Sequence, residues 1–124
     1  MQILLVDDSP VMRRYVARAL EMTGMDITIH EAKNGREAIG IAFRVRPDLI
    51  ITDLNMPEMS GEELVEKVYE APELRGTPVL VLSADRSLNR PRELLHAGAI
   101  AYLTKPVTPE VLKRSLTAIL GVRA

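Results

Sequence analysis

The sequence predicts an α/β fold in which a doubly wound, five-stranded parallel sheet carries five helices. Short apolar runs rich in branched side chains alternate with longer stretches of helical period, and the alternation occurs five times. Parallel strands that are linked by crossover helices produce this pattern. The length of 124 residues is enough for one hydrophobic core and is below the size at which chains usually divide. We therefore expect a single domain over residues 1–124.

The five predicted strands are all short. They are expected at residues 2–6, 27–32, 49–53, 78–82 and 100–103. The first, third and fourth of these segments are almost entirely apolar, which is typical of strands that are covered by helices on both faces. We therefore expect these three strands at the centre of the sheet.

The first helix is predicted from the residues at its two ends. Ser9 suits the N-cap because its hydroxyl can accept a backbone N–H, and Pro10 suits the first turn, where no N–H is needed. Gly24 is expected to end the helix. The side chains expected on the inward face are Met12, Tyr15, Val16, Ala19 and Leu20.

The second and third helices are bounded by similar signals. The second is expected over residues 35–46, after a capping Asn34 and before Pro47, which cannot continue a helix. The third is expected to begin near Gly61 and to fade around residues 71–72, where a proline follows an alanine.

The last helix repeats the pattern of the first. Thr108 is its expected N-cap, Pro109 lies in its first turn, and Gly121 is expected to close it. The side chains expected to face inward are Val111, Leu112, Leu116, Ile119 and Leu120.

Composition and charge exclude several classes of function. Apolar residues make up 47% and charged residues 27% of the chain, which is the balance of a folded globular domain. The net charge of −1, with Lys and Arg scattered, argues against direct binding to nucleic acid or to an anionic membrane. The chain has no cysteine, no signal segment and no apolar run that could span a bilayer, so the cytoplasm is the expected compartment.

Polar and charged residues collect where the predicted strands end. The residues that follow the five strands are, in order, Asp7-Asp8, Lys33-Asn34, Asp53, Ser83-Ala84 and Thr104-Lys105. In an open parallel sheet the binding site is the crevice at the carboxyl ends of the strands, near the point where strand order reverses. We therefore expect three carboxylates and one lysine to converge there.

This group of residues indicates phosphoryl chemistry supported by Mg²⁺. Carboxylates that lie close together repel one another, and a divalent cation relieves the repulsion. Mg²⁺ is commonly held by one or two carboxylates and a phosphoryl oxygen, so Asp8 and Asp53 are the expected ligands. The ammonium group of Lys105, across the crevice, suits a phosphoryl oxygen.

Five ordered motifs carry a resemblance to a known family. They are Val6-Asp7-Asp8-Ser9, Asp53-Leu54-Asn55-Met56-Pro57 with Gly61, Ser83-Ala84, Ala97-Gly98-Ala99, and Tyr102-Leu103-Thr104-Lys105-Pro106. Over essentially its whole length the chain resembles the receiver domains of two-component response regulators. The resemblance implies a flavodoxin-like sheet with the strand order 2-1-3-4-5.

The resemblance also implies a role for each residue of the crevice. Asp53 resembles the carboxylate that attacks a phosphohistidine and becomes an acyl phosphate. Asp8 resembles the direct Mg²⁺ ligand, Asp7 the acid that holds the ion largely through water, and the backbone carbonyl of Asn55 a further ligand. Lys105 would pair with the phosphoryl group.

Ser83 and Tyr102 resemble the two switch residues of the family. The Ser83 hydroxyl would turn toward the phosphoryl group, and the Tyr102 ring would follow from an outward to an inward rotamer. By the same resemblance, Asp85, just beyond Ala84, and Asn55 lie at positions that in the family tune how fast the acyl phosphate hydrolyses. The bond between Lys105 and Pro106 is expected to be cis by the same resemblance.

Two residues depart from the family pattern, Asp85 and Pro91. Pro91 falls where the family has the body of its fourth helix, and it would remove an interior hydrogen bond. We therefore expect that helix to be short or to start late. The surface formed by the fourth helix, the fifth strand and the fifth helix usually meets the targets of such receivers, so Pro91 bears on the choice of partner.

The function expected from the resemblance is a signalling switch that catalyses only its own phosphorylation and dephosphorylation. Its partners would be a sensor histidine kinase or a histidine phosphotransfer protein, and a downstream target protein. Residues 8–14 and 105–110 resemble the chemotaxis branch, whose regulators bind the flagellar motor switch. We expect a monomer, with dimerisation on phosphorylation as an open alternative.

Three other functions are alternatives to this switch. A phosphorelay carrier would show a long-lived acyl phosphate without motor binding. A Mg²⁺-dependent phosphatase would need an aspartate two residues after its nucleophile, where Asn55 stands. A flavin or nucleotide binder would need a loop rich in glycine and hydroxyls after the first strand, where the sequence has Asp7-Asp8-Ser9-Pro10.

Overall fold

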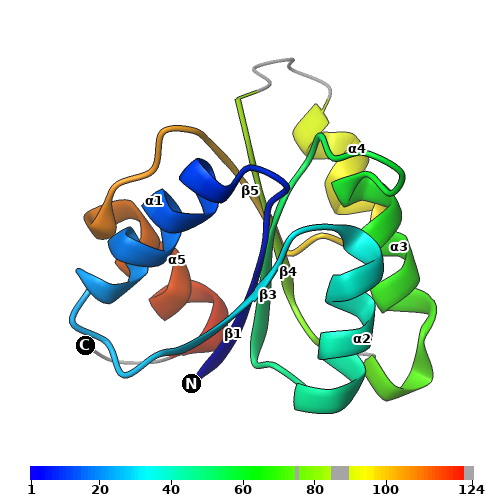
Figure 1. Cartoon of the computed structure of the whole chain (residues 1–124), viewed down its shortest axis with the longest axis horizontal. Coiled ribbons are helices and arrows are strands. Elements are labelled where there is room, and N and C mark those ends of the chain that lie inside the picture. Colours follow the sequence, from blue (N-terminus) through cyan, green and yellow to red (C-terminus); the bar gives the residue numbers. More distant parts are fainter. Residues whose placement is uncertain (75, 85–89, 122–124) are drawn as a thin grey trace.

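The computed structural model describes residues 1–74, 76–84 and 90–121, and it confirms the expected alternation of strands and helices (Figure 1). The strands are β1 (Gln2–Val6), β2 (Thr28–Ala32), β3 (Leu49–Asp53), β4 (Val79–Ser83) and β5 (Ala101–Thr104). The helices are α1 (Pro10–Glu21), α2 (Gly35–Val45), α3 (Gly61–Glu70), α4 (Arg90–Ala97) and α5 (Pro109–Leu120). A short 3-10 helix at Pro72–Leu74 precedes β4.

The strands form one parallel sheet in the order β2-β1-β3-β4-β5, which is the flavodoxin-like order that was expected. The three apolar strands β1, β3 and β4 are central, as predicted. Helices α1 and α5 cover one face, and α2, α3 and α4 cover the other (Figure 1). Strand order reverses between β1 and β3, so the carboxyl ends of these two strands flank the crevice where ligands bind in such sheets.

The core consists of two layers that the sheet separates. Leu4 and Val6 pack in the layer under α2 and α3, whereas Ile3 and Leu5 pack in the layer under α1 and α5. Successive side chains of a strand point to opposite faces, so a slip of one residue would exchange the two layers. Burial of each such side chain is worth about 1.5–3 kcal/mol, which fixes the register and the place where each strand ends.

Four helices begin at a side chain that accepts a backbone N–H. The pairs are Ser9 with Met12, Asn34 with Glu37, Ser60 with Glu63, and Thr108 with Val111. Three of these caps were predicted from the sequence, and Ser60 was not. Helix α2 ends at Val45, one residue earlier than expected, because Arg46 adopts a left-handed conformation with φ of 53°.

Three strand boundaries were predicted one residue too early. Strands β2, β4 and β5 begin at Thr28, Val79 and Ala101. Strands β4 and β5 also end one residue later, because Ser83 lies opposite Thr104 in the register. Pairing between strands decides these ends, and it depends on residues that are distant in sequence.

In the part of the chain that the structure describes, the fourth helix is short, as predicted. Helix α4 contains eight residues, and Pro91 is the second of them. A proline in the first turn of a helix costs little, because that turn needs no N–H from it. No helix in the part of the chain that the structure describes is both long and apolar enough to cross a bilayer.

Candidate functional site

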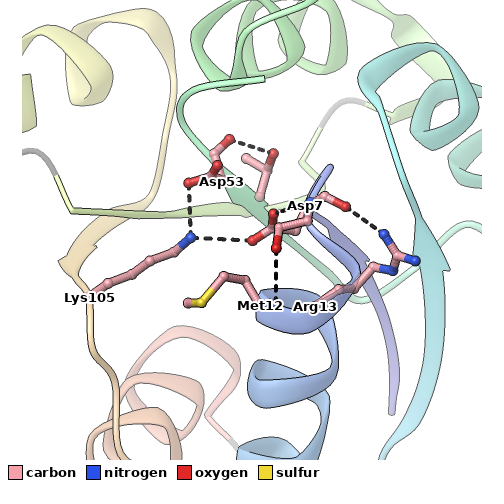
Figure 2. A network of polar contacts seen from close by, with 7 residues as sticks. Asp7, Met12, Arg13, Asp53 and Lys105 are labelled. Atoms are coloured by element: carbon pink, nitrogen blue, oxygen red, sulfur yellow. Dashed lines mark hydrogen bonds and ion pairs between the residues drawn. The ribbon is translucent and has the colours of Figure 1, made fainter. Parts of the chain in front are cut away.

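Two carboxylates and one ammonium group meet at the carboxyl ends of the strands (Figure 2). The Lys105 Nζ atom donates to Asp7 Oδ2 at 3.2 Å and to Asp53 Oδ1 at 3.1 Å. The side chains of Lys105 and Asp53 are 13% exposed, and that of Asp7 is 4% exposed. Ion pairs that are this well buried are only weakly screened by salt, so the contacts hold the three side chains together.

Local backbone contacts fix the position of Asp7. Its N–H donates to the carbonyl of Ala32 on the neighbouring strand at 3.1 Å, which continues the β1–β2 pairing by one residue. Its Oδ1 atom accepts the N–H of Ser9 at 2.9 Å. Ser9 in turn caps α1 through Met12. The end of β1 and the start of α1 are thus joined by a turn that holds the Asp7 carboxylate.

Asp53 is the last residue of β3, and the chain behind it is closely packed. Its carbonyl oxygen accepts the hydroxyl of the buried Thr52 at 2.9 Å. The N–H of Gly61 donates to the carbonyl of Leu54 at 2.8 Å. A Cβ atom at position 61 would collide with the Asp53 carbonyl oxygen and would lie 2.9 Å from the Leu54 Cα. Only glycine therefore lets α3 begin this close to Asp53.

Burial raises the pKa of the Asp53 carboxyl above its ordinary value of 3.8. The charge and the hydrogen bond of Lys105 act in the opposite direction, and the negative charge of Asp7 adds to the rise. The net direction is upward, so desolvation outweighs the ion pair with Lys105. The charged form of Asp53 is therefore less favourable in the folded protein than in water.

Three carboxylates are close enough to share one cation. Asp7, Asp8 and Asp53 each offer an oxygen, and these oxygens all lie within 4.8 Å of one another. Three carboxylates and the single ammonium of Lys105 leave two excess negative charges at the site. An all-oxygen donor set with that excess charge fits a hard divalent cation such as Mg²⁺.

The remaining predicted site residues surround this centre. Ser83 is fully buried at the end of β4, and its carbonyl accepts the N–H of Lys105 at 2.8 Å. Tyr102 on β5 is half-buried and packs against the core layer under α2 and α3. The Lys105–Pro106 bond is cis, which confirms the expectation. Asn55 and Ala84 are exposed in the loops after β3 and β4, and Asp85 lies outside the described residues.

One residue of the site was missed by the sequence analysis. Arg13 lies one turn inside α1, and its guanidinium donates to the Asp7 carbonyl at 2.7 Å (Figure 2). No sequence signal marks this contact, because an arginine on the first turns of a helix is usually a solvated surface residue. The fold brings it back to the loop that precedes its own helix.

The fold and the site together define a class of protein. A 2-1-3-4-5 parallel sheet that carries an acidic cluster and a lysine at its carboxyl end is the arrangement of a flavodoxin-like signalling domain of the receiver type. The sequence model of the response regulator receiver domain matches residues 3–117. The chain therefore belongs to the response regulator receiver domain family.

Relatives over nearly the full length lie in the same family. The chain is 38% identical over 122 residues to a chemotaxis protein CheY homolog of Campylobacter jejuni, covering 98% of this chain and 93% of that one. The solved structure of chemotaxis protein CheY4 of Vibrio cholerae is 36% identical with a TM-score of 0.86, covering 95% of this chain and 97% of that one. The signal receiver domain of a signal transduction histidine kinase from Syntrophus aciditrophicus is also 36% identical, with a TM-score of 0.85 and coverages of 97% and 89%. The protein is thus a CheY-like receiver, a signalling domain of two-component systems.

Proposed function

We propose that the chain is a single receiver domain over residues 1–124 in which Asp53 accepts a phosphoryl group from a phosphohistidine of a sensor kinase. The observation that carries this proposal is the ion pair of Lys105 with both Asp7 and Asp53, beside a third carboxylate. A lysine and a divalent cation beside one aspartate would be the parts that phosphoryl transfer needs.

The proposed reaction begins with Asp53 as the nucleophile. One carboxylate oxygen attacks phosphorus in line with the bond to the histidine nitrogen, and that bond breaks as the new O–P bond forms. Lys105 already contacts Asp53, so its ammonium can move from the carboxylate to the transferred phosphoryl oxygens. Mg²⁺, held by Asp8, Asp53 and the Asn55 carbonyl and by Asp7 largely through water, would supply further neutralisation of the phosphoryl charge.

The response to phosphorylation is proposed to pass through Ser83 and Tyr102. The acyl phosphate would carry about −1.5 to −2 charge in place of the single negative charge of the carboxylate, and it would place three strong acceptors next to Asp53. The Ser83 hydroxyl would donate to one of these oxygens and draw Ala84 inward with it. Tyr102, which packs beside this part of the sheet, would follow, and the surface of α4, β5 and α5 would then change.

The partners are inferred from the relatives. CheY-like proteins of similar length are named for chemotaxis, so we propose a histidine kinase as donor and a target such as the flagellar motor switch. The alternative is a phosphorelay carrier that passes its phosphoryl group to a histidine phosphotransfer protein. The alternative is supported because the chain is as similar in sequence to the receiver domain of a histidine kinase as it is to CheY4, at 36% identity in both cases.

The proposal is tested by loading the protein with a small phosphoryl donor, acetyl phosphate, in the presence of Mg²⁺. Intact-mass spectrometry is expected to show one added phosphoryl group on the wild type and none on Asp53→Asn. Asp26→Asn is the matched control, because Asp26 is exposed at the opposite end of the sheet. A phosphoryl group that persists in Asp53→Asn would refute Asp53 as the acceptor.

A further inference from the structure

The side chain of Arg13 on α1 contacts both β2 and the loop after β1, next to the acidic cluster. Figure 2 shows its contact with Asp7. From α1 it donates through Nη1 to the carbonyl oxygen of Asp7 at 2.7 Å. Through Nε it donates to Glu31 Oε1 on β2 at 2.9 Å. The Arg13 side chain is 19% exposed and that of Glu31 is 49% exposed, so the arginine lies mostly covered beside the end of β1.

The carbonyl that Arg13 holds belongs to the peptide unit between Asp7 and Asp8. The Asp7 carboxylate has contacts of its own, with the N–H of Ser9 and with Lys105. Asp8 is exposed, and within the described residues its side chain makes no hydrogen bond and no ion pair. The direction of the Asp8 carboxylate therefore depends on the plane of the preceding peptide, and Arg13 is the side chain that fixes this plane.

A guanidinium is well suited to this task. Its donors are held in a rigid planar fork, so a contact at Nε and a contact at Nη1 define the orientation of the whole group. Glu31 fixes one side of the fork, which aims the other side at the Asp7 carbonyl. A lysine carries the same charge on a flexible stem and cannot fix both contacts in one plane.

We propose that Arg13 is a positioning residue that makes the acidic cluster selective for Mg²⁺ over Ca²⁺. The inference rests on the proposed function, because it assumes that the cluster binds a divalent cation. Mg²⁺ requires near-ideal octahedral geometry with oxygens at about 2.0–2.1 Å, whereas Ca²⁺ accepts flexible arrangements at about 2.3–2.6 Å. A firmly held Asp7–Asp8 peptide favours the smaller ion, and a loosened peptide removes that preference.

The ratio of the two affinities separates positioning from simple electrostatics. A change in local charge alters the binding of both divalent ions by a similar factor, because both carry the same charge. A change in geometry weakens Mg²⁺ binding more than Ca²⁺ binding. Arg13→Lys is the decisive variant because it keeps the charge and removes the planar fork.

Isothermal titration calorimetry of the folded, unphosphorylated protein with Mg²⁺ and with Ca²⁺ tests the inference. Arg13→Lys is expected to weaken Mg²⁺ binding about tenfold, the scale seen for groups that support metal ligands, and Ca²⁺ binding less than about threefold. Glu31→Ala, which removes the orienting partner at a half-exposed position, is expected to lower the Mg²⁺/Ca²⁺ ratio in the same direction. Arg14→Gln, which changes a neighbouring charge on α1, is the control and is expected to leave the ratio unchanged.

The outcomes distinguish this inference from the proposed function on which it rests. A wild type that binds Mg²⁺, with the same Mg²⁺/Ca²⁺ ratio in Arg13→Lys and Glu31→Ala, would overturn the role of Arg13 alone. Equal weakening of both ions in Arg13→Lys would also overturn it. A wild type that binds neither ion would overturn the metal site, and the role of Arg13 with it.

Discussion

Lys105 is the residue on which the charge balance of the site depends. Its ammonium group lies between two largely buried carboxylates, and a third carboxylate is close by. Lys105 and a bound divalent cation would relieve the same repulsion. The site is therefore least favourable when both positive charges are absent, and the two should partly replace each other in stabilising the fold.

Lys105→Ala is expected to lower the free energy of unfolding by roughly 3 kcal/mol in EDTA, because it leaves two sheltered carboxylates without their counter-charge. The loss is smaller than the stability of a typical domain, so the variant still folds. Urea denaturation measures the loss, and Mg²⁺ is expected to restore part of it. Lys67→Ala on the exposed face of α3 is the control. If Mg²⁺ restored none of the lost stability, the idea that Lys105 and the cation relieve the same repulsion would be contradicted.

Asp53→Asn is expected to raise the melting temperature at pH 7 in the absence of divalent ions. The pKa of Asp53 is raised by burial, so its charged form destabilises the folded protein relative to a neutral side chain. The wild type regains this stability as the pH falls through the folded-state pKa and Asp53 becomes protonated. The gap between the two melting temperatures is therefore largest at pH 7 and closes as the pH approaches 3.8, the ordinary value. If the gap between the two melting temperatures widened as the pH falls, the pKa of Asp53 would be lowered in the folded protein and not raised.

At the scale of elements, the start of α3 is the part of the fold most closely tied to the site. Gly61→Ala would push a methyl group against the Asp53 carbonyl and the Leu54 Cα. Backbone cannot yield as a flexible side chain does, so we expect a loss of about 1–3 kcal/mol and weaker phosphorylation of Asp53. Thermal unfolding and acetyl phosphate labelling measure the two effects.

Gly40→Ala is the matched control for that substitution. Gly40 lies inside α2, and a Cβ atom there meets nothing within 4 Å. Replacing an open helical glycine by alanine is expected to stabilise the protein by about 0.5–1 kcal/mol. Loss of stability in both variants would mean that the close approach at Gly61 is not the cause.

Local features of the elements were predictable from the sequence, and contacts between elements were not. The caps at Ser9, Asn34 and Thr108 were predicted because each depends on residues three positions apart. The convergence of Asp7, Asp53 and Lys105 was predicted because parallel strands end at one edge. The left-handed turn at Arg46 and the contact of Arg13 with the Asp7 carbonyl depend on backbone angles and on packing, which no local pattern encodes.

At the scale of the whole molecule, ligand binding and global stability are coupled. The carboxylates and the lysine come from the ends of three different strands, so the unfolded chain has no site. A cation that binds only the folded state stabilises it by about 2.7 kcal/mol at one hundred times its Kd. We expect Mg²⁺ to raise the free energy of unfolding by this amount, seen as a higher urea midpoint with an unchanged slope, and Na⁺ at the same ionic strength to have little effect. Equal stabilisation by Na⁺ would indicate screening and not binding.

The ion pairs of Lys105 also have a consequence for synthesis of the chain. They join residues that are 52 and 98 positions apart in sequence, and β5 is the last strand of the sheet to leave the ribosome. If Asp53 is the phosphoacceptor, as proposed, a nascent chain that already contains it still lacks Lys105, which the proposed transfer needs. On the proposed function, competence to accept a phosphoryl group is acquired only once β5 and Lys105 have been synthesised, and shorter nascent chains would not draw phosphoryl groups away from longer ones.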